Sequence, residues 1–296
     1  MSPPRIALVT AAAARDLDDD LPPLVDALRA AGADVHVPNW DDAAVDWSGF
    51  DIALLRSTWD YTQRLPEFLA WTQRAARATR LLNPADVIAW NTDKHYLGVL
   101  EHAGVTIVPS AFIEPGTEPS AALERFLQSH ASAEFVVKPA IGAGSRDAQR
   151  YAREQREAAA EHAQRLLEAR RSVLLQPYLD RVDEHGETAL VYFGGQFSHA
   201  IRKGPLLRRG EGPTRALFAT EHITPRAPTA AEFALAEQTL TAIPFAKPLL
   251  YARVDVIHDG SGAPRVLELE LTEPSLFFAH GAGSADRFAA AILKSV

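Results

Sequence analysis

The stretches Leu-Tyr-Ala-Arg-Val-Asp-Val-Ile (250–257) and Val-Leu-Glu-Leu-Glu-Leu-Thr-Glu-Pro (266–274) decide the fold of this chain. In both, apolar residues alternate with polar ones, which is the pattern of a β-strand. The connection His-Asp-Gly-Ser-Gly-Ala-Pro-Arg (258–265) is short and rich in turn-forming residues. The two strands are therefore predicted to pair as an antiparallel hairpin.

Charged side chains gather on one face of this hairpin. Arg253 and Asp255 share a face of the first strand, and Glu268 and Glu270 share a face of the second. A turn centred near Ser261–Gly262 places Asp255 opposite Glu268 and Arg253 opposite Glu270. Carboxylates across a ladder repel unless something positive lies between them. Hard oxygen ligands of this kind suit Mg²⁺ holding phosphates, so we interpret the three acids as a metal site.

The simpler alternative is that this polar face meets water, as it does in many one-sided sheets. The sequence continues, however, as Thr-Glu-Pro-Ser-Leu-Phe-Phe (272–278), which carries apolar bulk onward into the fold. We therefore expect the polar face to line a cleft.

Composition limits the classes of function. The 296 residues are 47% hydrophobic and 23% charged, which is ordinary for a globular protein and enough for two or three lobes. A net charge of −8 argues against a nucleic-acid surface. The absence of cysteine excludes disulfides and thiolate chemistry. No window reaches the roughly 20 apolar residues of a membrane span, and the first apolar run favours a buried strand over a signal peptide, so we expect a cytoplasmic protein.

The N-terminal third predicts an α/β lobe with a parallel sheet. Strands are expected at 5–10, 34–38 and 51–56, with helices at 21–31 and 65–79. Ligands of such lobes gather at the carboxyl ends of the strands. The loop after the third strand supplies candidate substrate contacts, namely Arg56, Ser57, Trp59 and Asp60. A packed loop with a structural tryptophan is the alternative.

Further elements follow in mixed order. Helices are predicted at 91–104, 119–130, 154–171, 229–243 and 284–294, and strands at 105–108, 134–138, 172–179 and from 187 to 203. Asn91 or Thr92 is a plausible cap for the first of these helices. The stretch 204–228, with charged residues and scattered Gly and Pro, is expected to be a mobile loop.

A lysine at the end of an apolar strand precedes a glycine-rich loop. Lys138 follows Phe-Val-Val, and Gly142, Gly144 and Ser145 come shortly after. Backbone N–H groups of such a loop can approach phosphate. The spacing is neither that of a Walker A loop nor that of a dinucleotide-binding loop, and an ordinary turn is the alternative. A lysine in this setting nevertheless needs an anionic partner.

An extended, proline-locked segment offers a place for a purine. Its backbone could bond an adenine edge, and nearby acids could take ribose hydroxyls. The segment comprises Gln176, Pro177, Tyr178 and Leu179, and the acids are Asp183 and Glu187. Alone, it would read as a strand leading to a solvated loop.

Taken in this order, the motifs resemble the ATP-grasp superfamily over essentially the whole chain. The resemblance implies an α/β chain in which an N-terminal parallel-sheet lobe (1–90) precedes two α+β lobes (91–178 and 179–296) that clasp ATP. Lys94 and Lys138 would neutralise phosphates, and the three acids would hold Mg²⁺. Many relatives carry Asn where this chain has Glu270, which leaves the number of Mg²⁺ ions open.

The resemblance also implies a mechanism. A substrate carboxylate attacks the γ-phosphate of ATP, and a nitrogen nucleophile then displaces phosphate from the acylphosphate. Arg253 would face the transferring group, and Lys203 and His199, on one face of a strand, could contact the γ-phosphate or the substrate. Each of the last two could equally be structural.

Several strings are most similar to the branch that closes cycloserine from O-ureido-serine. They include Arg-Ser-Thr-Trp-Asp-Tyr (56–61) and Leu-Glu-Leu-Glu-Leu-Thr-Glu-Pro-Ser-Leu (267–276). Glu273 and Ser275 would then contact an amino-acid-like substrate. The alternatives are an intermolecular carboxylate–amine ligase and a non-catalytic nucleotide-binding module. Dimers are common in the resembling family, so a homodimer is expected.

Overall fold

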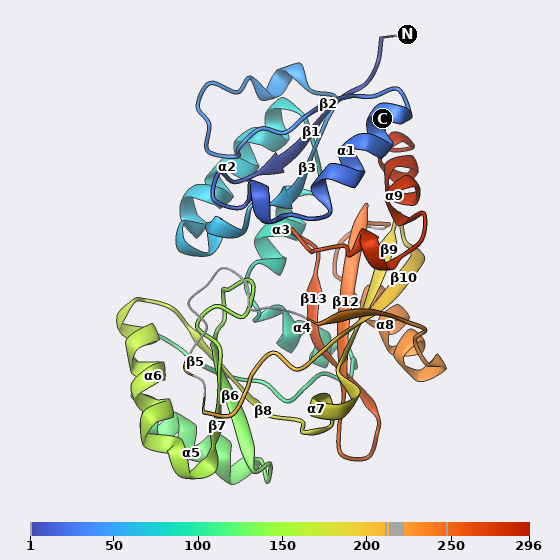
Figure 1. Cartoon of the computed structure of the whole chain (residues 1–296). Helices are drawn as coiled ribbons and strands as arrows, with labels where there is room; N and C mark the ends of the chain where they lie inside the picture. The colour runs from blue at the N-terminus through green and yellow to red at the C-terminus, as the bar shows by residue number, and fades with distance from the viewer. Residues whose placement is uncertain (1, 211, 213–221, 247) are drawn as a thin grey trace.

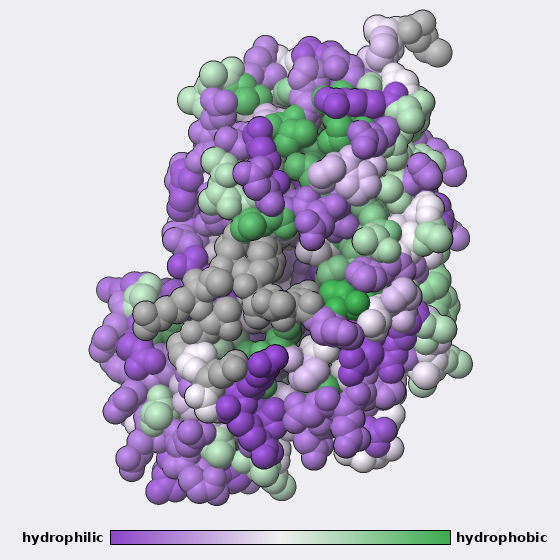
Figure 2. Space-filling view, in the orientation of Figure 1, coloured by the Kyte–Doolittle hydropathy of each residue, from purple (hydrophilic) through white to green (hydrophobic). Residues whose placement is uncertain are grey.

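The computed structural model describes residues 2–210, 212, 222–246 and 248–296. Three sheets form three lobes, with the N-terminal lobe at the top of Figure 1, the middle lobe at the lower left and the C-terminal lobe at the right. No helix in the described part of the chain is long and apolar enough to cross a membrane. Hydrophilic side chains cover most of the face drawn in Figure 2. The fold is the mixed α/β arrangement that the sequence predicted.

The N-terminal lobe is built on a parallel sheet of order β2-β1-β3-β4. Its strands are β1 (Arg5–Thr10), β2 (Asp34–His36), β3 (Ile52–Ser57) and β4 (Arg80–Leu82), and its helices are α1 (Leu21–Ala30) and α2 (Leu65–Ala78). Short 3₁₀ helices cover Arg15–Leu17, Trp47–Gly49 and Trp59–Gln63. The apolar runs of β1 and β3 are buried on both faces, as expected of parallel strands flanked by helices. The parallel sheet is as predicted.

The middle lobe pairs four antiparallel strands in the order β5-β8-β6-β7. They are β5 (Ala111–Ile113), β6 (Glu134–Pro139), β7 (Gln149–Ala152) and β8 (Val173–Pro177). Helices α5 (Pro119–Ser129) and α6 (Arg156–Glu168) cover one face of this sheet and share a core with it. A 3₁₀ turn at Arg153–Gln155 directly precedes α6. The helices and two of the strands were predicted, whereas the short β5 and β7 were not.

The C-terminal lobe carries an antiparallel sheet of order β11-β10-β9-β12-β13. Its strands are β9 (Glu187–Phe193), β10 (Gln196–Lys203), β11 (Ile223–Arg226), β12 (Tyr251–His258) and β13 (Pro264–Glu270). The other elements are α3 (Ala85–Asn91), α4 (Tyr96–His102), α7 (Arg181–His185), α8 (Ala230–Ala242), a 3₁₀ turn at Phe278–His280 and α9 (Ser284–Leu293). The hairpin register, Asp255 opposite Glu268 and Arg253 opposite Glu270, is the predicted one.

The faces of this last sheet explain where the polar groups go. Val254 and Val256 point into a core shared with α4 and α8. On the opposite face, Tyr251 and Phe193 pack against the N-terminal lobe. The same face continues as Arg253 and Asp255, which are buried polar residues at 5% and 1% exposure.

Three sequence expectations differ from the structure. The helix expected over 91–104 is divided, because α3 ends at Asn91 and α4 begins at Tyr96. Asn91 is therefore no cap, and its amide instead bonds the backbone of Leu269 and Leu271. Residues 105–108 join the sheet only through an isolated bridge at Ile107. Within 204–228, residues 223–226 form β11, and 211 and 213–221 lie outside the described residues.

Helix α9 returns the C-terminus to the N-terminal lobe, where it packs beside α1 (Figure 1). The three sheets lie within the expected ranges 1–90, 91–178 and 179–296, but α4 packs in the core of the C-terminal sheet and α9 packs beside α1. The ring of Phe288, which is fully buried, stacks on Phe193 at a centroid distance of 4.6 Å and meets Tyr251 edge-on at 5.9 Å.

We predict that Phe288→Ala lowers the free energy of unfolding by about 3–5 kcal/mol, because it leaves a cavity between two lobes. Urea unfolding followed by circular dichroism measures this loss. Phe233→Ala, at a ring that is 37% exposed, is the matched control and should cost much less. Equal losses for the two variants would contradict the packing assigned to α9.

Candidate active site

One cleft lies where the three lobes meet, and it collects most of the predicted site residues. Those that line it are Trp59, Lys94, Lys138, Gly142, Gly144, Ser145, Gln176, Pro177, Tyr178, Leu179, Glu187, Lys203, Arg253, Glu268, Glu270, Glu273 and Ser275. They come from every lobe and span more than 200 positions of the sequence. The fold therefore brings the separate motifs to a single place.

Two lysines meet one acid on the side of the middle lobe. The Nζ of Lys138 lies 3.0 Å from Oε1 of Glu268, and the Nζ of Lys94 lies 3.6 Å from the same atom. Burial alone would raise the pKa of Glu268, but the two ammonium groups outweigh it and lower that pKa to about 2. Glu268 is therefore charged in this arrangement.

A second group of charges surrounds Asp255. Arg253 donates from Nε and Nη2 to the two oxygens of Asp255, each at 2.8 Å, and also contacts Glu270. Lys203 donates to Asp255 at 2.7 Å and contacts Glu187. Burial would raise the pKa of Asp255, but Arg253 and Lys203 hold it below its usual value. The acids expected to repel one another are thus interleaved with cations.

The remaining two acids of this group behave differently. Burial raises the pKa of Glu187 to about 8, against the opposing charge of Lys203. Burial also raises the pKa of Glu270, although Arg253 opposes it. Protons therefore bind more readily at these two groups than at Asp255 or Glu268.

The donor set fits Mg²⁺. One oxygen each of Asp255, Glu268 and Glu270 lies within 4.8 Å of the others, and all three are hard ligands. Glu268 and Glu270 face the cleft, whereas Asp255 is only 1% exposed and has both oxygens bonded to cations.

A second cluster of possible metal ligands lies outside the cleft. It consists of His185, Glu232 and His258. Arg226 donates to Nε2 of His185 at 2.7 Å, and Glu232 bonds Thr188 and the backbone at the start of α8. A guanidinium so close opposes a dication, so we read this cluster as a capped helix end with polar neighbours.

The glycine-rich loop between β6 and β7 lies over the cleft. Gly144 has φ +62° and Ser145 has φ +61°, a left-handed conformation that turns successive backbone groups. Lys94 donates from Nζ to the carbonyl of Gly142 at 3.0 Å. Asp147 is held by Arg171 at 2.5 Å, which ties the far end of the loop to the middle lobe.

The segment after β8 forms an apolar wall. Val136, Tyr178, Leu179, Val182 and Ile257 line the cleft here. The guanidinium of Arg150 lies 3.5 Å from the centroid of the Tyr178 ring and holds it from behind. This wall presents aromatic and aliphatic side chains to the cleft.

The N-terminal lobe and the segment after β13 close the opposite end of the cleft. Trp59 donates from Nε1 to the carbonyl of Glu273 at 3.0 Å, and Tyr61 lines the same end of the cleft. Burial and the charge of Glu270 raise the pKa of Glu273 to about 8. Among the residues that the structure describes, Glu273 is the acid of the cleft without a lysine or arginine at ion-pair distance.

Five residues predicted for the site lie outside the cleft lining, in addition to Asp255. Arg56 is fully buried and donates to the carbonyl of Pro274. Ser57 bonds Thr10, and Asp60 bonds Trp40. His199, although on the same face as Lys203, bonds the carbonyl of Leu276 beneath the N-terminal lobe. Asp183 bonds Arg150 and the hydroxyl of Tyr178 behind the apolar wall.

Sequence reasoning missed other residues that line the cleft. They are Tyr61, Asn91, Thr92, Tyr96, Arg146, Phe277 and the run from Gly204 to Leu207. Tyr61 and Asn91 belong to motifs already noted, so the neighbouring site residues could have indicated that these two also line the cleft. Phe277 could not be found in this way, because it stands in the apolar run Leu-Phe-Phe (276–278), and such a run most often belongs to a core.

Two comparisons of sequence place the chain among known proteins. Residues 6–83 match the model described as the N-terminal domain of D-cycloserine synthetase DcsG. The cycloserine biosynthesis protein DcsG of Streptomyces lavendulae is 40% identical over 293 residues, which cover 98% of each chain.

Comparison with solved structures also finds DcsG. The crystal structure of D-cycloserine synthetase DcsG matches with a TM-score of 0.92 and 39% identity, covering 98% of this chain and 99% of that one. The ATP-grasp ligase PsnB, solved with Mg and ADP, matches at 0.65 and 18% identity, covering 99% of both chains. The D-alanine–D-alanine ligase of Bacillus anthracis, solved with ATP, matches at 0.70 and 15%, covering 98% and 96%. The last two show the fold alone. The chain therefore belongs to the D-cycloserine synthetase DcsG family, which has the fold of the ATP-grasp ligases.

Proposed function

We propose that this protein converts O-ureido-D-serine to D-cycloserine at the expense of ATP, by activating the carboxylate and closing a five-membered ring onto it. The observation that carries the proposal is the cleft itself. Lysines, an arginine and acids gather there between an apolar wall and a glycine-rich loop. The name of the 40% identical relative supports the choice of cycloserine as product.

ATP would lie with its purine against the apolar wall. The backbone of Gln176, Pro177, Tyr178 and Leu179 would meet the adenine edge. Of the two acids predicted for the ribose, Glu187 lines the cleft and Asp183 does not, so we assign the ribose hydroxyls to Glu187. Gly142, Gly144 and Ser145 would present backbone N–H groups to the phosphates.

Nucleotide binding would exchange the partners of the charged groups. Lys94 and Lys138 now contact Glu268, and they would turn to the phosphates, which are stronger competitors for ammonium groups. Glu268 would thereby be free to hold Mg²⁺ together with Glu270, and Asp255 would be the third ligand where it releases a cation. The ion, when bound, neutralises charge on the β- and γ-phosphates. The cations already present lower the pKa values of Asp255 and Glu268, which keeps these two acids charged until then.

The proposed reaction has three steps. An oxygen of the substrate carboxylate bonds to the γ-phosphorus as the bond to ADP breaks. The oxygen-bound nitrogen of the ureido group then bonds to the carbonyl carbon as phosphate leaves, and this nitrogen gives up its proton. Water finally hydrolyses the carbamoyl group from the ring nitrogen, which takes up a proton as carbon dioxide and ammonia are released. Arg253 lines the cleft next to Glu270 and would stabilise the tetrahedral oxyanion, with Lys203 beside it.

Glu273 suits an amino-acid substrate. It is a buried acid whose pKa is raised, and a cation beside it would favour its ionised form. The ammonium of the substrate would supply that cation. Trp59 and Ser275 line the same end of the cleft, so we place the substrate there.

The central test is to incubate the protein with Mg²⁺-ATP and O-ureido-D-serine, and to measure released phosphate and cycloserine mass. We expect both in equal amounts, and Glu268→Gln should lower the rate by about 100-fold or more while retaining the fold. Glu161→Gln, at an exposed acid of α6, is the matched control. Phosphate release that requires two amino acids, with a dipeptide as product, would instead indicate an intermolecular ligase.

Lys138→Ala should weaken binding of an ATP analogue by about tenfold or more, because hydrogen bonds to charged groups each contribute about 1.5–3 kcal/mol. Titration calorimetry measures this affinity. Lys294→Ala, at an exposed position of the C-terminal end, should leave it unchanged. An unaltered affinity in Lys138→Ala would refute the phosphate role of this lysine.

Glu273→Gln should flatten the pH dependence of stability. The pKa of Glu273 is raised to about 8 by burial and by Glu270, so the folded state binds a proton that the unfolded state releases. This contribution is complete below the ordinary pKa of glutamate and is lost as pH rises through about 8. Urea unfolding between about pH 5 and pH 9 without nucleotide tests it. An equal slope in wild type and variant would show that the carboxyl is not desolvated.

A further inference from the structure

The segment from Leu271 to Phe278 links the acid-bearing strand β13 to the end of the chain, and it is neither strand nor α-helix until the 3₁₀ turn at 278. Side chains from elsewhere hold it. Carbonyl groups of the segment accept hydrogen bonds from Asn83, Trp59, Arg56, Arg253 and His199, at Leu271, Glu273, Pro274, Ser275 and Leu276 in that order. An irregular backbone is thus fixed almost residue by residue.

Asp20 makes the densest of these contacts. Its Oδ2 accepts from the backbone N–H of Leu276 at 2.6 Å and of Phe277 at 2.9 Å, and its Oδ1 accepts from Phe278 at 2.7 Å. It stands at the start of α1, yet it makes no side-chain cap to its own helix. The carboxylate is 6% exposed and serves a segment about 256 positions away.

The backbone conformation of this segment is unfavourable by itself and needs stabilising contacts. Phe277 has φ +54°, in the left-handed region that costs a residue with a side chain about 1 kcal/mol or more. Three N–H groups converging on one carboxylate offset that cost, because charge-assisted hydrogen bonds are the strong ones. Arg56 lies 4.0 Å from Asp20 and donates to Pro274, so it supplies the opposing charge from the same lobe.

Reactive groups depend on this segment. Arg253 donates from Nη1 to the carbonyl of Ser275 at 2.9 Å, and its guanidinium lies 5.4 Å from the ring centroid of Phe277. Glu273 projects from the same segment into the cleft. The nucleotide-facing groups Lys94 and Lys138, by contrast, lie on other elements.

We propose that Asp20 is a positioning residue for the amino-acid side of the reaction. By fixing the backbone of 276–278 it sets the place of Arg253 and Glu273, and it leaves the nucleotide side unaffected. The kinetic part of this inference rests on the proposed function of the cleft. The structural part does not.

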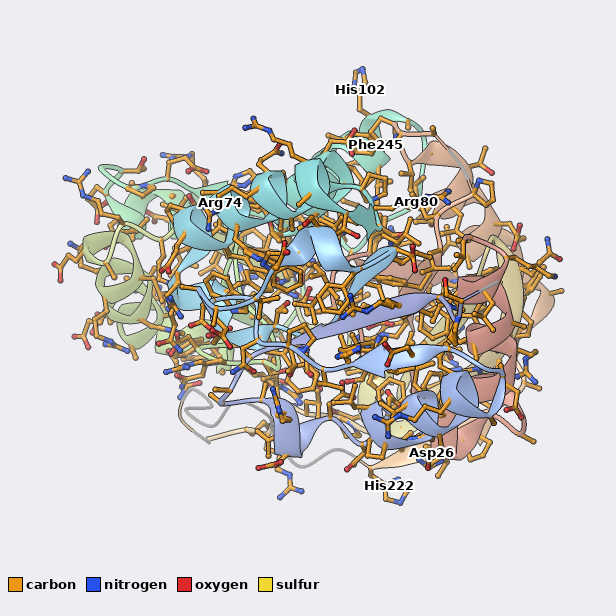
Figure 3. All side chains as sticks on the ribbon, turned by 90° about the horizontal axis from the view of Figure 1, so that it is seen from above. Asp26, Arg74, Arg80, His102, His222 and Phe245 are labelled. Atoms are coloured by element: carbon orange, nitrogen blue, oxygen red, sulfur yellow. The ribbon has the colours of Figure 1, made fainter. Side chains whose placement is uncertain are left out.

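The test uses the full chain with Asp20→Ala, Asp20→Asn and Asp26→Ala. Asparagine keeps one acceptor oxygen and loses the other, so it should be intermediate. Asp26 lies exposed on the outer side of the same helix and is the matched control (Figure 3). For Asp20→Ala we expect kcat/KM for the amino acid to fall about 100-fold, since small displacements at reacting groups have effects of that size. Affinity for an ATP analogue should stay within about twofold.

Hydrogen exchange measured by mass spectrometry gives a readout that needs no turnover. Peptides covering 271–278 should exchange faster in Asp20→Ala and Asp20→Asn than in wild type or Asp26→Ala. Unchanged exchange overturns the proposal, whether or not the wild type turns over O-ureido-D-serine. Equal loss of amino-acid and nucleotide binding also overturns it, because that pattern would mean general destabilisation. If the wild type releases no phosphate with O-ureido-D-serine but the exchange pattern is as expected, the proposed substrate is refuted. The role of Asp20 in fixing the backbone of 276–278 is then supported.

Discussion

Charge balance within a buried cleft is the constraint on which the rest of this structure depends. Asp255, Glu268, Glu270 and Glu187 lie where two strands and the start of a third meet, and such a set could not remain charged alone. Lys94, Lys138, Lys203 and Arg253 interleave with them. These cations come from four different places in the chain, namely the segment before α4, β6, β10 and β12. The lobes must therefore assemble correctly for the acids to be tolerated at all.

The same pairing explains how one site can bind both the anionic phosphates of a nucleotide and a divalent cation. Each lysine now in contact with a carboxylate is a potential phosphate ligand, and each carboxylate so released is a potential ligand for a dication. Binding of a nucleotide with its metal would exchange partners without leaving any group unpaired. Glu273 stands apart from this exchange, because no lysine or arginine of the described residues lies at ion-pair distance from it. It is the acid best suited to recognise a group carried by the substrate.

The N-terminal lobe contributes to the cleft mainly through the backbone of another lobe. Arg56 and Trp59 stand in a motif that looked like a set of substrate contacts, yet both donate to carbonyls of the segment after β13. Arg56 has no exposure at all. His199 is a parallel case on β10. Side chains that a motif marks as important can therefore act on a site by holding the segment that carries it.

The sequence by itself determined the hairpin, its register and the face on which the charges lie, because strand alternation and a short turn are local properties. It also determined the parallel N-terminal sheet, from apolar runs separated by helical ones. Only the tertiary structure decided which lysines meet these acids, since Lys138 and Lys203, the partners of Glu268 and Asp255, lie on other elements. It alone divided the helix near Asn91, whose amide is used by the backbone of β13, and turned the carboxylate of Asp20 away from its own helix. Such long-range pairings carry no local signal, because a hydrogen bond to a backbone group depends on position in space and not on the identity of the residue that offers it.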